Sequence, residues 1–187
     1  VEGGGSKTFS KAKSLLYGHP ALAHKLLDKI TQTVVAYLQN KIDAGVQVIQ
    51  LFDSWAGILD QSLYDTFALP YITQICQAID RVPLIVFSKG AWFSLADLGK
   101  IKGVALGLDW QISPEHARRT LGEKRVLQGN LDPSCLLSNP EVIKRYTQQM
   151  LAGFGRHHIA NLGHGVYPNT PVEHVKTFVE TVQSHLY

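Results

Sequence analysis

The sequence predicts an α/β protein, because short apolar segments of strand length alternate with longer segments of helical periodicity. Five segments rich in β-branched residues span 46–52, 82–87, 103–108, 124–129 and 157–162. Helical patterns span 21–44, 63–78, 94–100, 114–121, 140–154 and 171–185. Connections of this length between strands favour a parallel sheet covered by helices.

Two parallel architectures fit this alternation. A closed (β/α)8 TIM barrel needs about 250 residues, whereas the 187 residues here provide five strand and helix units. A barrel would therefore contain this chain as its C-terminal five β/α units, with the GGGSK segment at 3–7 following a strand that lies before Val1. An open five-stranded sheet is the alternative. Neither a linker nor a low-complexity segment interrupts the sequence, so we expect residues 1–187 to belong to one domain.

Several helices begin at recognisable signals. SPEHA, SNPEV and NTPVEHV each place a proline at the first helical position after a residue that can cap the helix. Thr170 is the expected cap ahead of Pro171. In the GGGSK segment, Ser6 can cap a turn, and the alternative is that the glycine-rich backbone holds an anion at the start of a helix.

Composition argues against several classes of protein. The net charge of +3 is small and no basic run alternates with aromatic residues, so we expect no nucleic-acid partner. The longest apolar runs, such as VPLIVF at 82–87, are far shorter than the roughly 20 residues that cross a bilayer, so we expect no membrane insertion. Cys76 and Cys135 lie far apart without CxxC or HxC spacing, which favours neither a disulfide nor a metal site.

Polar residues follow each predicted strand. Because ligand sites form at the carboxyl ends of the strands in both architectures, these side chains could converge on one mouth. They are Asp53, Ser54, Ser88, Lys89, Asp109, Asn130, Asp132 and His164, with Trp55, Trp92 and Trp110 as apolar walls. The alternative for each one alone is a helix cap or an ordinary polar loop residue.

His164 differs from the other histidines because it lies between Gly163 and Gly165. Glycine permits backbone torsions denied to other residues and lets a ligand or a neighbouring backbone approach closely. At the end of a strand, an imidazole in such a loop can donate a hydrogen bond or a proton to a carboxylate. The spacing matches neither a dinucleotide fingerprint nor a P-loop, and no GxSxG nucleophile motif is present.

Six blocks, in order and spacing, resemble the C-terminal part of uroporphyrinogen decarboxylase. They are VEGGGSKTF, GVQVIQLFDSWAG, FALPYI, GLDW, LQGNLDPS and NLGHGVYPNTPVEHV. The resemblance extends over essentially all 187 residues. It implies the C-terminal part of a single TIM-barrel domain, a homodimer and a cytoplasmic location, with a plastid leader as an open alternative.

The resemblance also implies an enzyme, a carboxy-lyase that converts the four acetate side chains of uroporphyrinogen III into methyl groups without metal or organic cofactor. The product would be coproporphyrinogen III, in haem and chlorophyll biosynthesis. His164 would contact a substrate carboxylate as the candidate catalytic residue and proton donor, and Ser54 would bind substrate carboxylate. Phe52 and Asp53, on either side in LFDS, are further substrate-binding candidates. The family's arginine-rich loop, pyrrole-binding aspartate and site tyrosine would lie before Val1.

Two alternatives remain beside this hypothesis. A zinc- and corrinoid-dependent methyltransferase of the same superfamily resembles this fold, but its zinc needs a His-Cys-Cys type of cluster, which Cys76 and Cys135 do not provide. The other alternative is a non-catalytic tetrapyrrole-binding protein on the same fold. It would lack the arginine loop and the aspartate.

Overall fold

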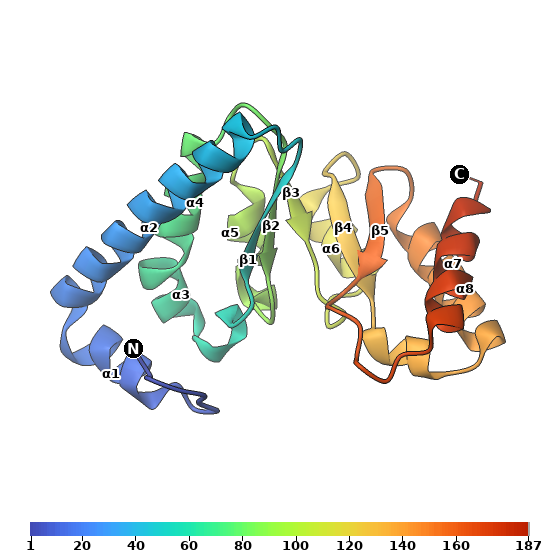
Figure 1. Ribbon diagram of the computed structural model, residues 1–187, viewed down its shortest axis with the longest axis horizontal. Coiled ribbons are helices and arrows are strands. Elements are labelled where there is room, and N and C mark those ends of the chain that lie inside the picture. Colours follow the sequence, from blue (N-terminus) through green and yellow to red (C-terminus); the bar gives the residue numbers. More distant parts are fainter. Residues whose placement is uncertain (187) are drawn as a thin grey trace.

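Five parallel strands form one sheet in the computed structural model, which describes residues 1–186 (Figure 1). The strands are β1 (Ile49–Asp53), β2 (Leu84–Ser88), β3 (Val104–Gly107), β4 (Leu127–Leu131) and β5 (His158–Leu162). Each strand pairs with the next one along the chain, in the order β1-β2-β3-β4-β5. A doubly wound sheet reverses its strand order at a switch point, whereas a (β/α)8 barrel adds each strand beside the previous one. The order confirms the predicted TIM-barrel fold class.

Helices precede the sheet and connect its strands. The α-helices within residues 1–186 are α1 (Ser10–Gly18), α2 (Pro20–Asp43), α3 (Gln61–Phe67), α4 (Leu69–Ala78), α5 (Leu95–Gly99), α6 (Pro114–Leu121), α7 (Pro140–Phe154) and α8 (Val172–Gln183). Short 3₁₀ helices are η1 (Ala56–Ile58), η2 (Trp92–Ser94) and η3 (Pro133–Leu137). None of the helices described has both the length and the apolar character needed to cross a bilayer.

The helices pack on one face of the sheet and leave the other face open. Figure 1 shows α2 to α5 on the β1 side of the strands and α7 and α8 on the β5 side. The main apolar cluster joins residues of these helices to residues of the strands, as Ile75, Val86 and Ile143 illustrate. Burial alternates along the edge strand β5, where Ile159 is 41% exposed, and on the other edge strand, β1, Phe52 is 63% exposed. The exposed side chains mark the inner face of a barrel wall.

The predicted helix 63–78 is two helices, and proline is the physical reason. Pro70 lies in the first turn of α4, and a proline inside a continuous helix would lack the N–H that bonds to the carbonyl four residues earlier. The chain therefore breaks at Ala68, which leaves the helical region at φ −122° and ψ −60°. By contrast, α6 and α7 have the predicted bounds, and Ser113 and Asn139 cap them as expected.

Two strands, β1 and β4, begin three residues later than predicted. Val46 N–H still donates to the Lys41 carbonyl at the end of α2 (3.2 Å), so β1 begins at Ile49 instead of 46. In the segment predicted to begin β4 at 124, the Arg125 carbonyl accepts a hydrogen bond from the Arg118 side chain (2.7 Å), and the strand starts at Leu127.

Helix α1 and the start of α8 also differ from the prediction. Helix α1 was not predicted because none of its residues is buried, which removes the apolar period. Ahead of it, Ser6 Oγ accepts a hydrogen bond from Phe9 N–H (2.9 Å), which is the capped turn considered for GGGSK, and the Glu2 carboxylate accepts from Ala12 N–H in the first turn (2.8 Å). Thr170 is not the cap of α8, because the helix begins at Val172 after an extended Pro171 and the Thr170 hydroxyl has no partner among the described residues.

Arg118 connects α6 to the ends of α7 and β4. The residue is buried, with 5% of its surface exposed. It donates to the carbonyls of Phe154 (2.9 Å), His157 (2.8 Å) and Arg125 (2.7 Å). Only arginine carries this many donors in one planar group.

Replacing Arg118 should therefore destabilise the fold. We expect Arg118→Met to lower the free energy of unfolding by about 3 kcal/mol or more, because the buried carbonyls lose their donors. Arg119→Met is the matched control and should cost less than about 0.5 kcal/mol, since Arg119 is exposed and makes a long ion pair with Glu115 (3.6 Å) and a contact with the His116 ring (3.2 Å). Urea unfolding of the two variants measures the difference, and equal midpoints would contradict the role of Arg118.

Candidate functional site

A cavity of about 330 Å³ opens on the inner face of the sheet, toward the carboxyl ends of the strands. Each strand, or the residue directly after it, contributes to the lining, through Gln50, Phe87, Leu108, Gln128 and Asn161. Gln128 Nε2 donates to Gln50 Oε1 (3.3 Å), which links β4 to β1 across the inner face. This polar pair lies beneath the predicted site.

Three of the four predicted site residues meet in this cavity. Phe52 and Ser54 line it from the end of β1, and His164 lines it from the loop after β5. In a flat sheet, β1 and β5 would lie about 19 Å apart, at about 4.8 Å per strand. The strand edges share one cavity because the sheet curls as a barrel wall does.

Phe52 and His164 are both exposed and each has one aromatic neighbour. The Phe52 ring meets Phe87 edge to face, with centroids 5.7 Å apart. The His164 ring meets Trp110 edge to face, with centroids 6.2 Å apart. The resulting surface combines apolar walls with the Ser54 hydroxyl and the His164 imidazole, groups that can donate hydrogen bonds to a carboxylate.

The two glycines beside His164 have different roles. A Cβ on Gly163 would lie 2.5 Å from Trp110 N and 3.1 Å from the Asn130 carbonyl oxygen, which are backbone atoms. A Cβ on Gly165 would meet nothing within 4 Å. Gly163 therefore allows the β5 loop to pack on the loop after β3, and this contact positions His164.

Asp109 and Asn130 hold the loops together instead of facing the cavity. The Asp109 carboxylate is 2% exposed and accepts hydrogen bonds from Gly90 N–H (2.5 Å) and Gln111 N–H (2.9 Å). The Asn130 amide donates to the Asp109 carbonyl (2.8 Å). Asp132 caps η3 by accepting from Ser134 N–H (2.8 Å). The contacts of Asp109, Asn130 and Asp132 therefore support the alternative role of loop or capping residue for these three.

Asp53 is not among the residues that line the cavity, because it lies between Phe52 and Ser54 and side chains alternate along a strand. Burial raises the pKa of the Asp53 carboxyl to about 6, and a hydrogen bond from the Trp55 backbone acts in the opposite direction. Nearby, the Tyr64 hydroxyl donates to Ser88 Oγ (2.9 Å). Burial raises the pKa of Tyr64, and the Asp53 charge adds to this increase.

The sequence prediction missed the polar residues inside the strands. Gln50, Gln128 and Asn161 all line the cavity. Each interrupts an otherwise apolar strand, and that interruption was the available signal, because a polar side chain in a buried strand needs a partner or a solvated face.

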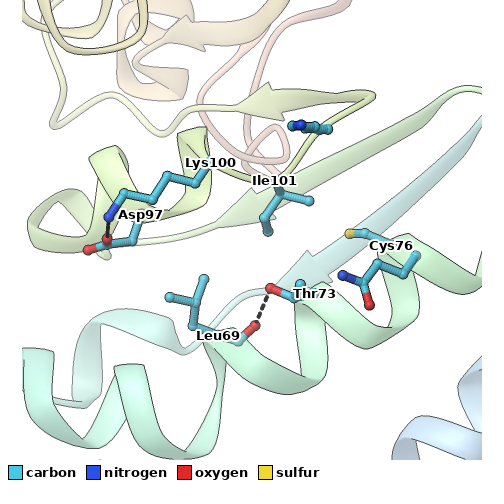
Figure 2. Close-up of a pocket in the computed structure, with 8 residues that line it drawn as sticks. Leu69, Thr73, Cys76, Asp97, Lys100 and Ile101 are labelled. Atoms are coloured by element: carbon cyan, nitrogen blue, oxygen red, sulfur yellow. Dashed lines mark hydrogen bonds and ion pairs between the residues drawn. The ribbon is translucent and has the colours of Figure 1, made fainter.

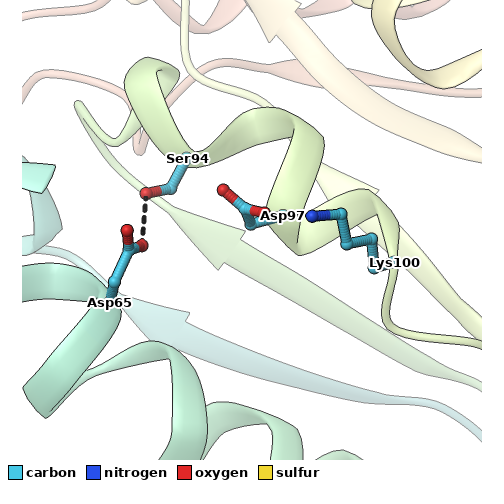
Figure 3. Close-up of polar contacts among 4 residues, drawn as sticks. All are labelled: Asp65, Ser94, Asp97 and Lys100. Carbon is cyan, nitrogen blue, oxygen red and sulfur yellow. Dashed lines mark hydrogen bonds and ion pairs between the residues drawn. The ribbon is translucent and has the colours of Figure 1, made fainter.

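Another hollow, of about 530 Å³, lies in the outer helix layer between α4 and α5 (Figure 2). Leu69, Thr73 and Cys76 form its α4 side. Lys100 is paired with Asp97 (2.6 Å), as Figure 3 also shows.

The polar groups around this hollow have structural partners. Ser94 Oγ donates to Asp65 (3.4 Å), a contact that joins η2 to α3. Within residues 1–186, no three His, Cys, Asp or Glu side chains lie close enough together to hold a metal ion. The inner-face cavity, which gathers the strand ends, is the candidate site.

Comparison with known proteins identifies the family. The sequence model described as "Uroporphyrinogen decarboxylase (URO-D)" matches residues 1–185. The chain belongs to the uroporphyrinogen decarboxylase family.

Curated members of this family are similar along the whole chain. Uroporphyrinogen decarboxylase of Flavobacterium johnsoniae is 46% identical over 187 residues, which cover 99% of this chain and 55% of the relative. The enzymes of Schizosaccharomyces pombe and Ovis aries are each 44% identical, and the matches cover 96% and 99% of this chain and 54% and 53% of those relatives. This chain therefore spans about half the length of the curated relatives it matches.

A solved structure supports the fold. A methyltransferase from Methanosarcina mazei superposes with a TM-score of 0.82 over 91% of this chain and 52% of its own, at 20% sequence identity. At that identity, the likeness shows a shared fold and does not extend to the chemistry.

Gly163→Ala should destabilise the protein, because its methyl group would press on backbone that cannot rotate away. We expect a loss of about 1–3 kcal/mol in the free energy of unfolding. Gly165→Ala is the control, and it should stay within about 0.5 kcal/mol. Thermal or urea unfolding gives both values, and equal losses in the two variants would contradict the packing role of Gly163.

The raised pKa of Asp53 predicts a pH dependence of stability. The folded protein keeps this proton up to about pH 6, whereas the unfolded chain releases it near pH 3.9. The stability that the protonated form contributes is therefore present below about pH 4 and is lost as the pH rises through 6. We expect Asp53→Asn to be more stable than wild type by about 2 kcal/mol at pH 7 and equal to it near pH 4.

Urea unfolding at several pH values measures this difference. Asp43→Asn is the control, because Asp43 lies in an exposed ion pair with Arg81 (2.7 Å). The Asp53 prediction fails if the gap between wild type and Asp53→Asn does not widen from pH 4 to pH 7.

Proposed function

We propose that this chain provides part of the active site of a uroporphyrinogen decarboxylase, which converts the four acetate side chains of uroporphyrinogen III into methyl groups and yields coproporphyrinogen III. One observation carries the proposal. Ser54 and His164, the residues that the family resemblance assigns to substrate carboxylate, line the same cavity from opposite edges of the sheet.

The chemistry needs placement and proton transfer more than an electron carrier. A proton adds to the pyrrole α-carbon next to the carbon that carries the acetate, and the ring becomes a cation with positive charge on the acetate-bearing carbon, where an exocyclic C=CH₂ bond can form. The bond between the acetate CH₂ and its carboxylate then breaks, carbon dioxide leaves, and the electron pair of that bond neutralises the cation. The exocyclic CH₂ takes up a proton as the ring carbon loses one. Each acetate therefore consumes one proton in total, and the protein must orient the carboxylate and stabilise developing charge.

The residues of this chain divide these tasks. Ser54 and His164 donate hydrogen bonds to a carboxylate, and His164 can also supply a proton. The exposed ring of Phe52 provides an apolar surface for a pyrrole. Asp53 stays a predicted substrate-binding residue of lower rank, because its neighbours line the cavity and it does not.

The remaining parts of the proposal come from the family. An arginine-rich loop, a pyrrole-binding aspartate and a tyrosine would come from the part of the barrel that this chain does not contain. A homodimer and a cytoplasmic location are likewise predictions, which analytical ultracentrifugation and cell fractionation would test.

Removing either carboxylate contact should impair decarboxylation. We expect His164→Ala to lower kcat/KM about 100-fold, because it removes a hydrogen bond to charge and a proton donor. Ser54→Ala should lower kcat/KM about tenfold through KM, because it removes one neutral donor. Formation of coproporphyrinogen by the intact protein, followed by chromatography of the oxidised porphyrins, measures these changes.

His116→Ala is the control for these variants, since His116 is an exposed histidine on α6 that contacts Arg119. It should keep wild-type rates. If uroporphyrinogen is converted and His164→Ala alters neither turnover nor affinity, the proposed role of His164 is wrong.

A further inference from the structure

Lys89 follows directly after β2 and its ammonium group lies among tryptophan rings. Its Nζ atom is 5.4 Å from the ring centroid of Trp110 and 6.0 Å from that of Trp55. These distances are within the range of cation–π attraction, for which tryptophan is the best partner. The two rings come from the loops after β3 and β1, so Lys89 lies between the loops on either side of its own strand.

The backbone of Lys89 is held on both sides. Its N–H donates to the Asp53 carbonyl (3.0 Å), and its carbonyl accepts from Gly57 N–H (2.8 Å). Gly57 and Gly90 pack so closely that a Cβ on Gly57 would lie 2.8 Å from Gly90 Cα. The origin of the Lys89 side chain is therefore well defined, while its four-carbon stem can still move.

Among the residues that the structure describes, the Lys89 ammonium group has no anionic partner. Within residues 1–186, the ion pairs involve other lysines and arginines, and no carboxylate or carbonyl oxygen accepts a hydrogen bond from Lys89 Nζ. An ammonium has three N–H donors, and ring faces attract its charge without supplying oxygen acceptors. Lys89 is thus a half-buried cation that can bind a carboxylate.

Trp110 connects this cation to the cavity. Its ring contacts Lys89 Nζ, and it also meets the His164 ring edge to face, with centroids 6.2 Å apart. His164 lines the cavity, and the Trp110 ring lies between it and Lys89 Nζ. A substrate with several carboxylates on one macrocycle can reach both groups.

We propose that Lys89 binds a second carboxylate of the substrate, next to the one held by Ser54 and His164, and that Trp55 and Trp110 hold the ammonium group in place until that carboxylate arrives. This inference rests on the proposed function and adds a specificity-determining residue to the same site. The proposal accounts for a lysine that has no acidic partner among the described residues at the carboxyl ends of the strands, because its charge pairs with a carboxylate of the substrate.

Substitutions that separate charge from packing test the proposal. Lys89→Met keeps an apolar stem of similar length against the indole rings, and Lys89→Arg keeps the charge. Lys124→Met is the matched control, because it removes the same charge from an exposed lysine near the start of β4, at the opposite end of the strands. Steady-state decarboxylation of uroporphyrinogen by the intact protein gives KM and kcat. Fluorescence titration with uroporphyrin, the oxidised octacarboxylate, gives a Kd that does not depend on turnover.

We expect Lys89→Met to raise both KM and the Kd for uroporphyrin about tenfold, with kcat within about twofold of wild type. Lys89→Arg should stay within about threefold of wild type in both constants, and Lys124→Met should match wild type. Raising the salt concentration should weaken uroporphyrin binding more steeply in wild type than in Lys89→Met, because one charge contact is missing in the variant.

Two results would overturn the proposal. Wild-type KM and Kd in Lys89→Met would show that the charge does not meet the substrate. Equal impairment of Lys89→Arg and Lys89→Met would show that only the shape of the lysine between the rings matters. Failure of the proposed function gives a different pattern, since the wild-type protein would then not convert uroporphyrinogen. The titration would still report whether Lys89 binds a carboxylate.

Discussion

Gly163 lies so close to the Trp110 backbone that no side chain fits between them, and the site depends on this contact. The loop after β3 that carries Trp110 is itself held in place, because the Asp109 carboxylate accepts from Gly90 N–H in the loop after β2 and the Asn130 amide of β4 donates to the Asp109 carbonyl. Close packing of backbone on backbone leaves no room for a side chain at Gly163. These contacts fix the loop after β5 against the loop after β3, and the position of His164 follows from that.

The candidate site depends also on the curvature of the sheet. Ser54 and His164 come from opposite edges of a five-stranded sheet, yet they line one cavity. The inner face between them carries Gln50 and Gln128, whose hydrogen bond crosses the concave surface. A barrel wall therefore brings together groups that a flat sheet would keep apart. The helices α2 to α8 cover the outer face and leave the inner one free for a ligand (Figure 1).

Polar groups at the mouth divide into those that hold the loops and those that face the ligand. The side chains of Asp109, Asn130 and Ser88 form hydrogen bonds within the protein. Ser54, His164 and Lys89 keep donors that no protein acceptor uses in the described residues, and each can meet an anion. This division is the one that the proposed decarboxylation needs, in which the protein contributes charge and orientation.

Local sequence patterns were enough to predict the alternation of strands and helices, the bounds of α6 and α7, and the residues that follow each strand. These features depend on local rules, namely apolar period, proline position and capping side chains. The folded arrangement was needed to show that Ser54 lines the cavity while Asp53 does not, and that Gln50, Gln128 and Asn161 line it as well. The physical reason is that strand register, sheet curvature and loop packing join residues far apart in the chain, and no local pattern specifies which side chains meet.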